Sequence, residues 1–168
     1  MFDKDTWEIL SFIVTVIGLP IAILIFFYQA RRERANEEEE EYQLLNDAYN
    51  EFLRVVLKNS DLHLRSNAPA PNLTPDQEER MLVIFDMLIA FFERAYLVAY
   101  SPDMPPDKAR RWNSWEDFMR EWCRRENFRA RLPELLRGED PEFSAYIRAL
   151  AEEEQRVMQL ESEQKKPT

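Results

Sequence analysis

The chain has 168 residues, 45% of them hydrophobic, and a formal net charge of -10. This length allows one compact domain with an appendage. Its 2 glycines exclude a glycine-rich phosphate-binding turn, and its 1 histidine and 1 cysteine exclude a disulfide framework or a multi-Cys/His metal site. Because the charge is strongly negative, we expect no nucleic-acid binding.

A long apolar segment lies near the N-terminus. From Ile9 to Tyr28 the only polar side chains are those of Ser11 and Thr15, and about 20 apolar residues let a helix cross the roughly 30 Å hydrocarbon core of a bilayer. The residues before it are acidic and no small-residue cleavage site follows, which argues against a signal peptide. Residues 1–30 are therefore predicted to form a short outside tail and a transmembrane helix.

The residues flanking this span predict its orientation. Trp7 and Tyr28 stand at its two ends, where aromatic rings prefer the membrane interface, and Arg31, Arg32 and Arg34 follow it directly. Positively charged flanks stay on the cytoplasmic side. We therefore expect a single-pass membrane protein, with the N-terminus outside and the C-terminal domain cytoplasmic.

Small side chains recur inside the span, at spacings of four, three and four residues: Ser11, Thr15, Gly18 and Ala22. On a helix this spacing places them on one stripe. Small stripes allow a second membrane helix to approach closely, so this is a candidate packing stripe. Chance scatter of small residues is the alternative, and the sequence leaves both open.

Residues 31–60 are predicted to form a membrane-proximal amphipathic helix. The five consecutive glutamates of 37–41 are typical of a solvated stretch. Beyond them, apolar residues fall on heptad a and d positions: Tyr42, Leu45, Tyr49, Phe52 and Val56. Such a seam must be buried against another helix. The pattern leaves open whether that helix belongs to the same chain or to a second one.

Residues 61–164 are predicted to form a cytosolic helical bundle. After a loop around 67–72, Thr74, Pro75 and Gln77 are typical of an N-cap, an N1 proline and a capping box. The helix that they open runs to about Tyr100 and is apolar almost all round. Charged residues inside it argue against a second span, since each costs roughly 2.5 to 3.5 kcal/mol at the bilayer centre. It is predicted to be the central helix of the bundle.

Three carboxylates of this central helix, Glu79, Asp86 and Glu93, are seven residues apart and share one face. A di-iron bundle would also need Glu-x-x-His motifs, and the sequence has none. The row is therefore interpreted as a thin solvated stripe. With no recognisable catalytic constellation, we expect no enzyme activity, cofactor, metal or small-molecule substrate.

The segment 106–138 is basic and holds three of the four tryptophans. Ser114 and Asp117 resemble a capping box that opens a helix there. Either its aromatic side chains complete the bundle core, which we favour because the bundle needs a third apolar face, or they contact anionic lipid or an acidic partner. Arginine and tryptophan are favoured at interfaces, so the candidate docking patch consists of Arg110, Arg111, Trp112, Trp115, Trp122, Arg124, Arg125 and Arg129.

A last helix is predicted after Gly138, which is expected to cap the preceding region. Asp140 and Pro141 form its N-cap and N1 positions. Its apolar seam comprises Phe143, Tyr146, Ile147, Leu150, Val157 and Leu160. Glu153 interrupts the seam, and residues 165–168 are predicted to be a frayed tail.

Several short motifs recur in an order that resembles uncharacterised bacterial single-span membrane proteins with a helical cytoplasmic domain. They are Gly18-Leu19-Pro20 in the span, Tyr28-Gln29 before the arginines, Tyr49-x-x-Phe52-Leu53, Phe92-Glu93-Arg94-Ala95-Tyr96, and Trp112-x-x-Trp115 followed by Phe128-Arg129. The resemblance covers most of the chain. The resemblance implies the same topology, with the span in a bacterial inner membrane, and it implies no particular chemistry.

The sequence as a whole predicts an all-α protein in which one N-terminal transmembrane helix continues into a cytosolic bundle of about four helices. The expected function is that of a non-catalytic accessory or scaffold subunit of a membrane protein complex. Its partners would be the lipid bilayer and other membrane-protein subunits, or further copies of itself. The alternative is a self-associating, membrane-anchored sensor or effector that pairs the seams 42–56 and 143–160 between chains.

Overall fold

The computed structural model describes the backbone of residues 4–66 and 72–164, and the side chains of most residues from Ile21 onward within those ranges. The chain divides into an N-terminal unit, Met1–Leu44, and a compact unit, Leu45–Thr168. The compact unit therefore begins inside the range 31–60, which the sequence suggested as a separate membrane-proximal helix.

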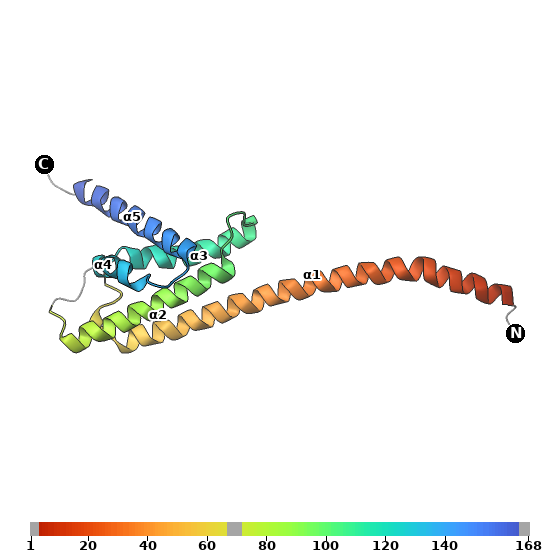
Figure 1. The fold of residues 1–168 in the computed structure, drawn as a ribbon, viewed down its shortest axis with the longest axis horizontal. Helices are drawn as coiled ribbons and strands as arrows, with labels where there is room; N and C mark the ends of the chain where they lie inside the picture. The colour runs from red at the N-terminus through yellow and green to blue at the C-terminus, as the bar shows by residue number, and fades with distance from the viewer. Residues whose placement is uncertain (1–3, 67–71, 165–168) are drawn as a thin grey trace. The chain divides into compact units, whose positions relative to one another are not determined.

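Every regular element within the described ranges is a helix (Figure 1), which confirms the all-α fold and the helical bundle. The elements are α1 (Lys4–Lys58), the short 3-10 helix η1 (Ser60–Leu62), α2 (Pro75–Ala99), α3 (Pro106–Cys123), α4 (Glu126–Leu135) and α5 (Pro141–Gln164).

The start of α2 has the predicted capping box. Thr74 Oγ1 accepts a hydrogen bond from the backbone N–H of Gln77 at 3.3 Å, and Gln77 Oε1 accepts one from the backbone N–H of Thr74 at 2.9 Å. Each side chain thereby satisfies a backbone donor that the first helical turn leaves unpaired. The helix ends at Ala99, before Pro102, so both predicted limits of this helix are confirmed to within a residue or two.

The predicted start of the next helix is wrong. α3 begins at Pro106, a proline in the first turn after Pro105, so Ser114 and Asp117 lie in the helix interior and cap nothing. A serine followed three residues later by an acid also occurs inside helices, whereas a proline at N1 marks a start more directly. The helix ends at Cys123, and the separate helix α4 begins at Glu126.

The predicted cap of the last helix is confirmed. Asp140 Oδ1 accepts hydrogen bonds from the backbone N–H groups of Glu142 and Phe143, both at 2.9 Å. Gly138 is not itself the C-cap of α4, which is Leu136. It lies two residues further on, with a φ of 90° that side chains other than glycine rarely adopt.

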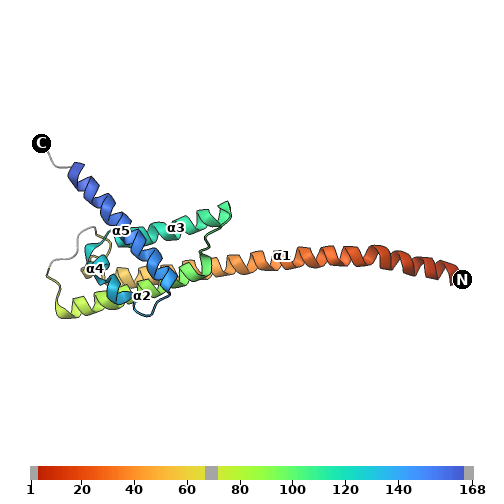
Figure 2. The same cartoon turned by 45° about the horizontal axis from the view of Figure 1, so that its top comes forward.

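The C-terminal turns of α1 belong to the core of the compact unit. Leu45, Tyr49, Phe52 and Val56 are all buried. In Figures 1 and 2 this part of α1 lies alongside α2, and the ring of Tyr49 is 5.5 Å from that of Phe91. From Leu45 to Val56 the seam predicted from the heptad spacing is therefore buried within its own chain, whereas its first member, Tyr42, is half-buried.

The seam of α5 is buried in its first half only. Phe143, Ile147 and Leu150 are in the core, and the ring of Phe143 is 5.7 Å from that of Tyr96 in α2. Val157 and Leu160 are exposed. These three apolar side chains of the first half therefore pack within the chain itself.

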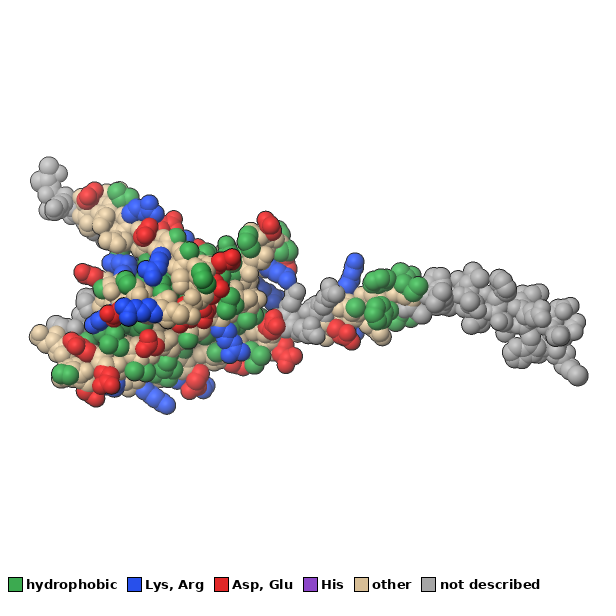
Figure 3. Space-filling view, viewed as in Figure 1, with side chains coloured by type: hydrophobic (Ala, Val, Ile, Leu, Met, Phe, Trp, Pro, Cys, Tyr) green, Lys and Arg blue, Asp and Glu red, His purple; other side chains and the backbone are tan. Residues whose placement is uncertain are grey.

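The described side chains of the N-terminal unit include a continuous apolar stretch. Ile21 and the residues from Ile23 to Tyr28 are between 47% and 67% exposed, and Figure 3 shows these apolar side chains clustered on the described part of this unit. Arg31 and Arg32 follow and are exposed.

The predicted transmembrane span falls largely outside the described side chains. The side chains that lie outside the described set include those of the packing stripe, Ser11, Thr15, Gly18 and Ala22, and of two predicted interface residues, Trp7 and Arg34. Among the residues that the structure describes, no helix combines the length and the apolar character needed to cross a bilayer.

Candidate functional site

The three tryptophans of the predicted docking patch lie in the core. Trp112 is 3% exposed, and Trp115 and Trp122 are each 1% exposed. The ring of Trp122 is 5.7 Å from that of Phe52, and the ring of Trp115 is 5.5 Å from that of Phe91. A partner surface cannot reach rings buried in this way. The aromatic side chains therefore complete the bundle core, the alternative that the sequence favoured, and the three tryptophans have to be removed from the predicted docking patch.

A polar network joins α3 to α5 beside these rings. Trp112 Nε1 donates a hydrogen bond to Tyr146 Oη at 3.0 Å, and Tyr146 Oη donates to the Glu116 carboxylate. Burial raises the pKa of Tyr146, and the hydrogen bond to Glu116 raises it further. The phenol therefore stays protonated at neutral pH and acts as a structural link between the two helices.

Glu154 is a buried carboxylate between two arginines. It is 4% exposed, and it accepts from Arg120 at 3.2 Å and from Arg124 at 2.8 Å. Arg120 also pairs with Glu116 and Glu153, each at 2.8 Å. Burial disfavours the charge of Arg120, but the three carboxylates outweigh it and raise its pKa. Arg124, a predicted patch residue, is therefore already neutralised within the chain.

Arg125 is also a member of the predicted patch, and it is only 5% exposed. Its Nη1 donates to the backbone carbonyl oxygens of His63, Leu64 and Ser66. Burial lowers its pKa. Among the described residues its Nε and Nη2 atoms have no hydrogen-bond partner. Arg125 thus ties the turn after η1 to the start of α4, and it offers no exposed charge to a partner.

Of the remaining patch residues, Arg110 and Arg111 are exposed on α3. Arg129 Nη1 donates to the backbone carbonyl of Cys123 at 2.7 Å. Burial raises the pKa of the Cys123 thiol to about 12. The thiol is therefore protonated at neutral pH, which makes it a poor nucleophile.

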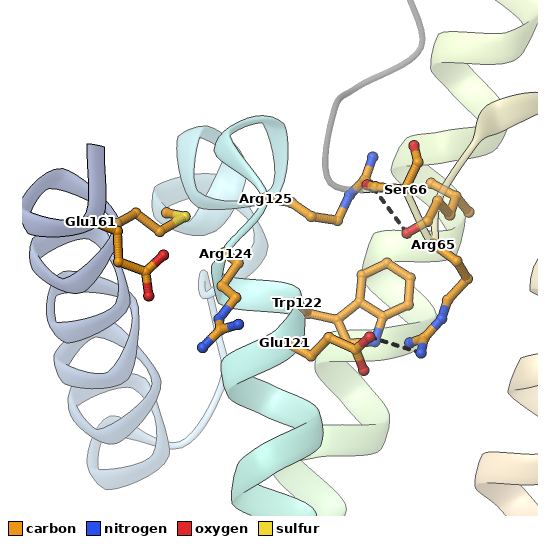
Figure 4. A pocket seen from close by; sticks show the side chains of 9 residues that line it. Arg65, Ser66, Glu121, Trp122, Arg124, Arg125 and Glu161 are labelled. Atoms are coloured by element: carbon orange, nitrogen blue, oxygen red, sulfur yellow. Dashed lines mark hydrogen bonds and ion pairs between the residues drawn. The ribbon is translucent and has the colours of Figure 1, made fainter. Parts of the chain in front are cut away.

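A small cavity of about 170 Å³ lies where the ends of α3 and α5 meet the turn after η1 (Figure 4). Arg65 and Glu121 form an ion pair of 2.8 Å on its wall, with Arg124 and Glu161 on the other side. Charges of both signs face each other here, and Trp122 supplies an apolar wall. Its lining contains neither histidine nor cysteine, and the hydroxyl of Ser66, which also lines it, donates a hydrogen bond to the backbone carbonyl of His63 at 2.8 Å.

The outward side of α2 carries apolar residues that sequence reasoning did not single out. Val83 is 52% exposed, Met87 43% and Leu97 60%, and Ala90 lies exposed between them. Together with Arg94 these residues are spaced four, three, four and three apart, the spacing of a coiled-coil seam. This spacing could have revealed the exposed seam from the sequence, but apolar residues occur almost all round the helix and hide the pattern.

The row Glu79, Asp86 and Glu93 runs along one flank of this seam. Glu79 and Asp86 are exposed and Glu93 is half-buried, and within the described part of the chain no basic side chain pairs with any of the three. We call the seam and this row together the outer α2 surface; it comprises Glu79, Val83, Asp86, Met87, Ala90, Glu93, Arg94 and Leu97.

The turn before α5 adds another carboxylate to the acidic flank. Glu93 Oε1 accepts a hydrogen bond from the backbone N–H of Asp140. A hydrogen bond with Glu93 raises the pKa of Glu139 to about 7, with further contributions from burial and from the charges of Glu93 and Asp86. Glu139 and Glu93 therefore form a hydrogen-bonded carboxyl pair at one end of the acidic flank.

Comparison with protein-family models, curated proteins and solved structures gave no match. Across the described residues no three His, Cys, Asp or Glu side chains converge in a way that could hold a metal ion. His63 lies exposed in the turn after η1, with a φ of 49°. Within the described part of the chain, the geometry thus offers the ion-paired Arg120 and Arg124, the buried Arg125, and an exposed surface on α2 that is partly apolar and partly acidic.

Proposed function

We propose that this chain is a non-catalytic accessory or scaffold subunit of a membrane protein complex, anchored by the N-terminal part of α1 and docking through its helical bundle. The observation that carries the proposal is the exposed apolar stretch of α1 before Arg31. Successive helix residues point about 100° apart, so consecutive apolar residues cover every side of the helix. A helix that is apolar all round favours a bilayer or a protein interior.

The apolar stretch from Ile9 to Tyr28 and the arginines after it support a single-pass anchor with the bundle on the cytoplasmic side. The buried tryptophans and neutralised arginines support a structural rather than catalytic role for the bundle. A self-associating sensor ranks second, because it would need apolar seams whose members Tyr49, Phe52 and Phe143 are buried in this chain.

Membrane fractionation tests the anchor. We expect the full chain to stay in the membrane pellet after an alkaline carbonate wash. The double substitution Ile13→Arg and Ile17→Arg should release it, since each arginine adds roughly 2.5 to 3.5 kcal/mol to insertion near the bilayer centre. Leu57→Arg, at a 75% exposed position of the compact unit, is the matched control and should stay in the pellet.

Purification in mild detergent tests the role as a subunit. We expect a stoichiometric complex with at least one other membrane protein. A homo-oligomer without foreign subunits would favour the sensor alternative. A full chain that remains in the supernatant without detergent would contradict the anchor itself.

A further inference from the structure

We infer that the outer α2 surface docks an amphipathic helix of a partner protein, one that carries lysines or arginines beside an apolar stripe. The inference rests on the proposed function, since it specifies the partner chemistry for the docking role given there to the bundle. Three observations support it: the exposed seam, the unneutralised acidic flank and an adjoining groove.

The seam is long enough to receive several helical turns. From Val83 to Leu97 it extends about 21 Å at 1.5 Å per residue. Its apolar side chains are between 43% and 60% exposed where the structure gives their exposure. Ala90 lies at its middle, and a small residue there lets the backbone of a second helix approach closely. A helix with matching apolar positions would cover this surface.

Charge determines which helix fits. Glu79, Asp86 and Glu93 are seven residues apart, so they line the same flank over four turns. In a coiled-coil pair, the residues at the e and g positions of one helix flank the apolar seam and contact the charged flank of the other helix. Lysines or arginines at those positions would neutralise the flank, with which no basic side chain pairs in the described part of the chain.

The same charge disfavours two other occupants. A second copy of α2 would bring a further row of carboxylates next to this one, and like charges at this distance repel. An anionic lipid surface would be repelled for the same reason. A basic helix is therefore the occupant that the surface favours.

A groove of about 330 Å³ between α1 and α2 adjoins the seam. Val83 and Met87 belong to both, and Val55 of α1 and Ile84 of α2 add further apolar wall. A large apolar side chain of the docked helix could insert there, next to the seam. This gives the docked helix a defined register along α2.

A designed peptide tests the inference on the full chain, kept in a zwitterionic mild detergent. The probe is a dye-labelled helical peptide of about 18 residues, with leucines on one stripe and lysines on both flanks. Its matched control has glutamate at every lysine position. Fluorescence anisotropy should show that the lysine peptide binds, that its binding weakens as salt rises, and that the glutamate peptide binds at least tenfold more weakly.

Variants locate the binding surface. The pair Val83→Glu and Leu97→Glu should weaken binding of the lysine peptide at least tenfold. The pair Glu79→Gln and Asp86→Asn should weaken it about threefold to tenfold and reduce its dependence on salt. Leu57→Glu, also at an exposed leucine, should leave binding unchanged. All five positions are exposed, so thermal melts should show that each variant folds.

Several outcomes would overturn the inference: equal binding of both peptides, no binding of either, or an equal loss in Leu57→Glu. A dimer in sedimentation velocity that Leu97→Glu dissociates would show that a second copy occupies the surface instead. Loss of membrane association with peptide binding intact would overturn only the anchor. Membrane association without peptide binding would overturn only the inference made here.

Discussion

Adjacent glutamates at the α3–α5 contact have different environments. Glu153 is half exposed and pairs with Arg120 alone, whereas Glu154 is buried and pairs with both Arg120 and Arg124. An exposed ion pair contributes little because water screens it. If Glu154 loses its charge, Arg124 loses this ion pair and Arg120 keeps only Glu116 and Glu153 as partners.

We therefore expect Glu154→Gln to lower the free energy of unfolding by about 1–3 kcal/mol. Glu153→Gln is the matched control and should lower it by less than about 1 kcal/mol. Urea unfolding followed by tryptophan fluorescence would measure both, since Trp115 and Trp122 lie in the core. Equal effects of the two substitutions would contradict this account of the network.

Glu139 makes stability depend on pH. The hydrogen bond with Glu93, with burial and the nearby charges, raises its pKa to about 7 in the folded chain from an ordinary value near 4.5. The folded state therefore binds a proton that the unfolded state releases between these two pH values. The stability due to protonated Glu139 is fully present below about pH 4.5, and it is lost as the pH rises through about 7.

Glu139→Gln removes this dependence. We expect the variant to melt at a higher temperature than the natural chain at pH 8 and at nearly the same temperature at pH 5. Glu134→Gln, at an exposed carboxylate paired with Arg131, should show no such gain at pH 8. A melting difference that does not change between pH 5 and pH 8 would argue against the raised pKa.

At the scale of elements, the helix caps could be predicted from the sequence, whereas the burial of charged side chains by tertiary contacts could not. The caps of α2 and α5 followed from Thr74 with Gln77 and from Asp140, because a capping side chain binds backbone groups two or three residues away. The burial of Arg125 and Glu154 depends on partners about 30 to 60 positions distant. No spacing within one helix reveals such partners.

The tertiary role of the C-terminal turns of α1 gives an element-scale prediction. A chain shortened to 39–168 should fold cooperatively, because it keeps Tyr49, Phe52 and Val56. A chain shortened to 59–168 should lose its cooperative melt and shift its tryptophan emission to the red, because Trp115 and Trp122 lose the rings packed on them. An unchanged melt of the shorter chain would show that α1 is dispensable for the bundle.

Along the whole molecule, basic and acidic residues are segregated in sequence. Arginines follow the apolar N-terminal stretch, glutamates occupy 37–41, and a second basic segment lies within 106–138. In the described part of the compact unit, arginines of this second segment, such as Arg120 and Arg124, are neutralised by glutamates of α5. The arginines after residue 30 directly follow the apolar stretch, so they are the charges that set the proposed orientation.

Labelling of intact cells tests that orientation. In a chain carrying Asp3→Cys, a membrane-impermeant maleimide should react from outside. In a chain carrying Ser162→Cys, at an exposed position of α5, it should react only after the cells are opened. The opposite pattern would reverse the proposed topology, and labelling of both positions in intact cells would contradict a sealed span between them.

The buried thiol of Cys123 provides a measure of breathing in the bundle. Its side chain is closed off by the core, and its high pKa keeps the reactive thiolate scarce. A thiol reagent can therefore modify the natural chain only during the moments when α3 and its neighbours separate. When reclosing is faster than modification, the rate of that reaction reports how often such openings occur. A partner helix that binds the folded bundle would make these openings rarer and so slow the modification of Cys123. Binding could then be detected without an engineered probe.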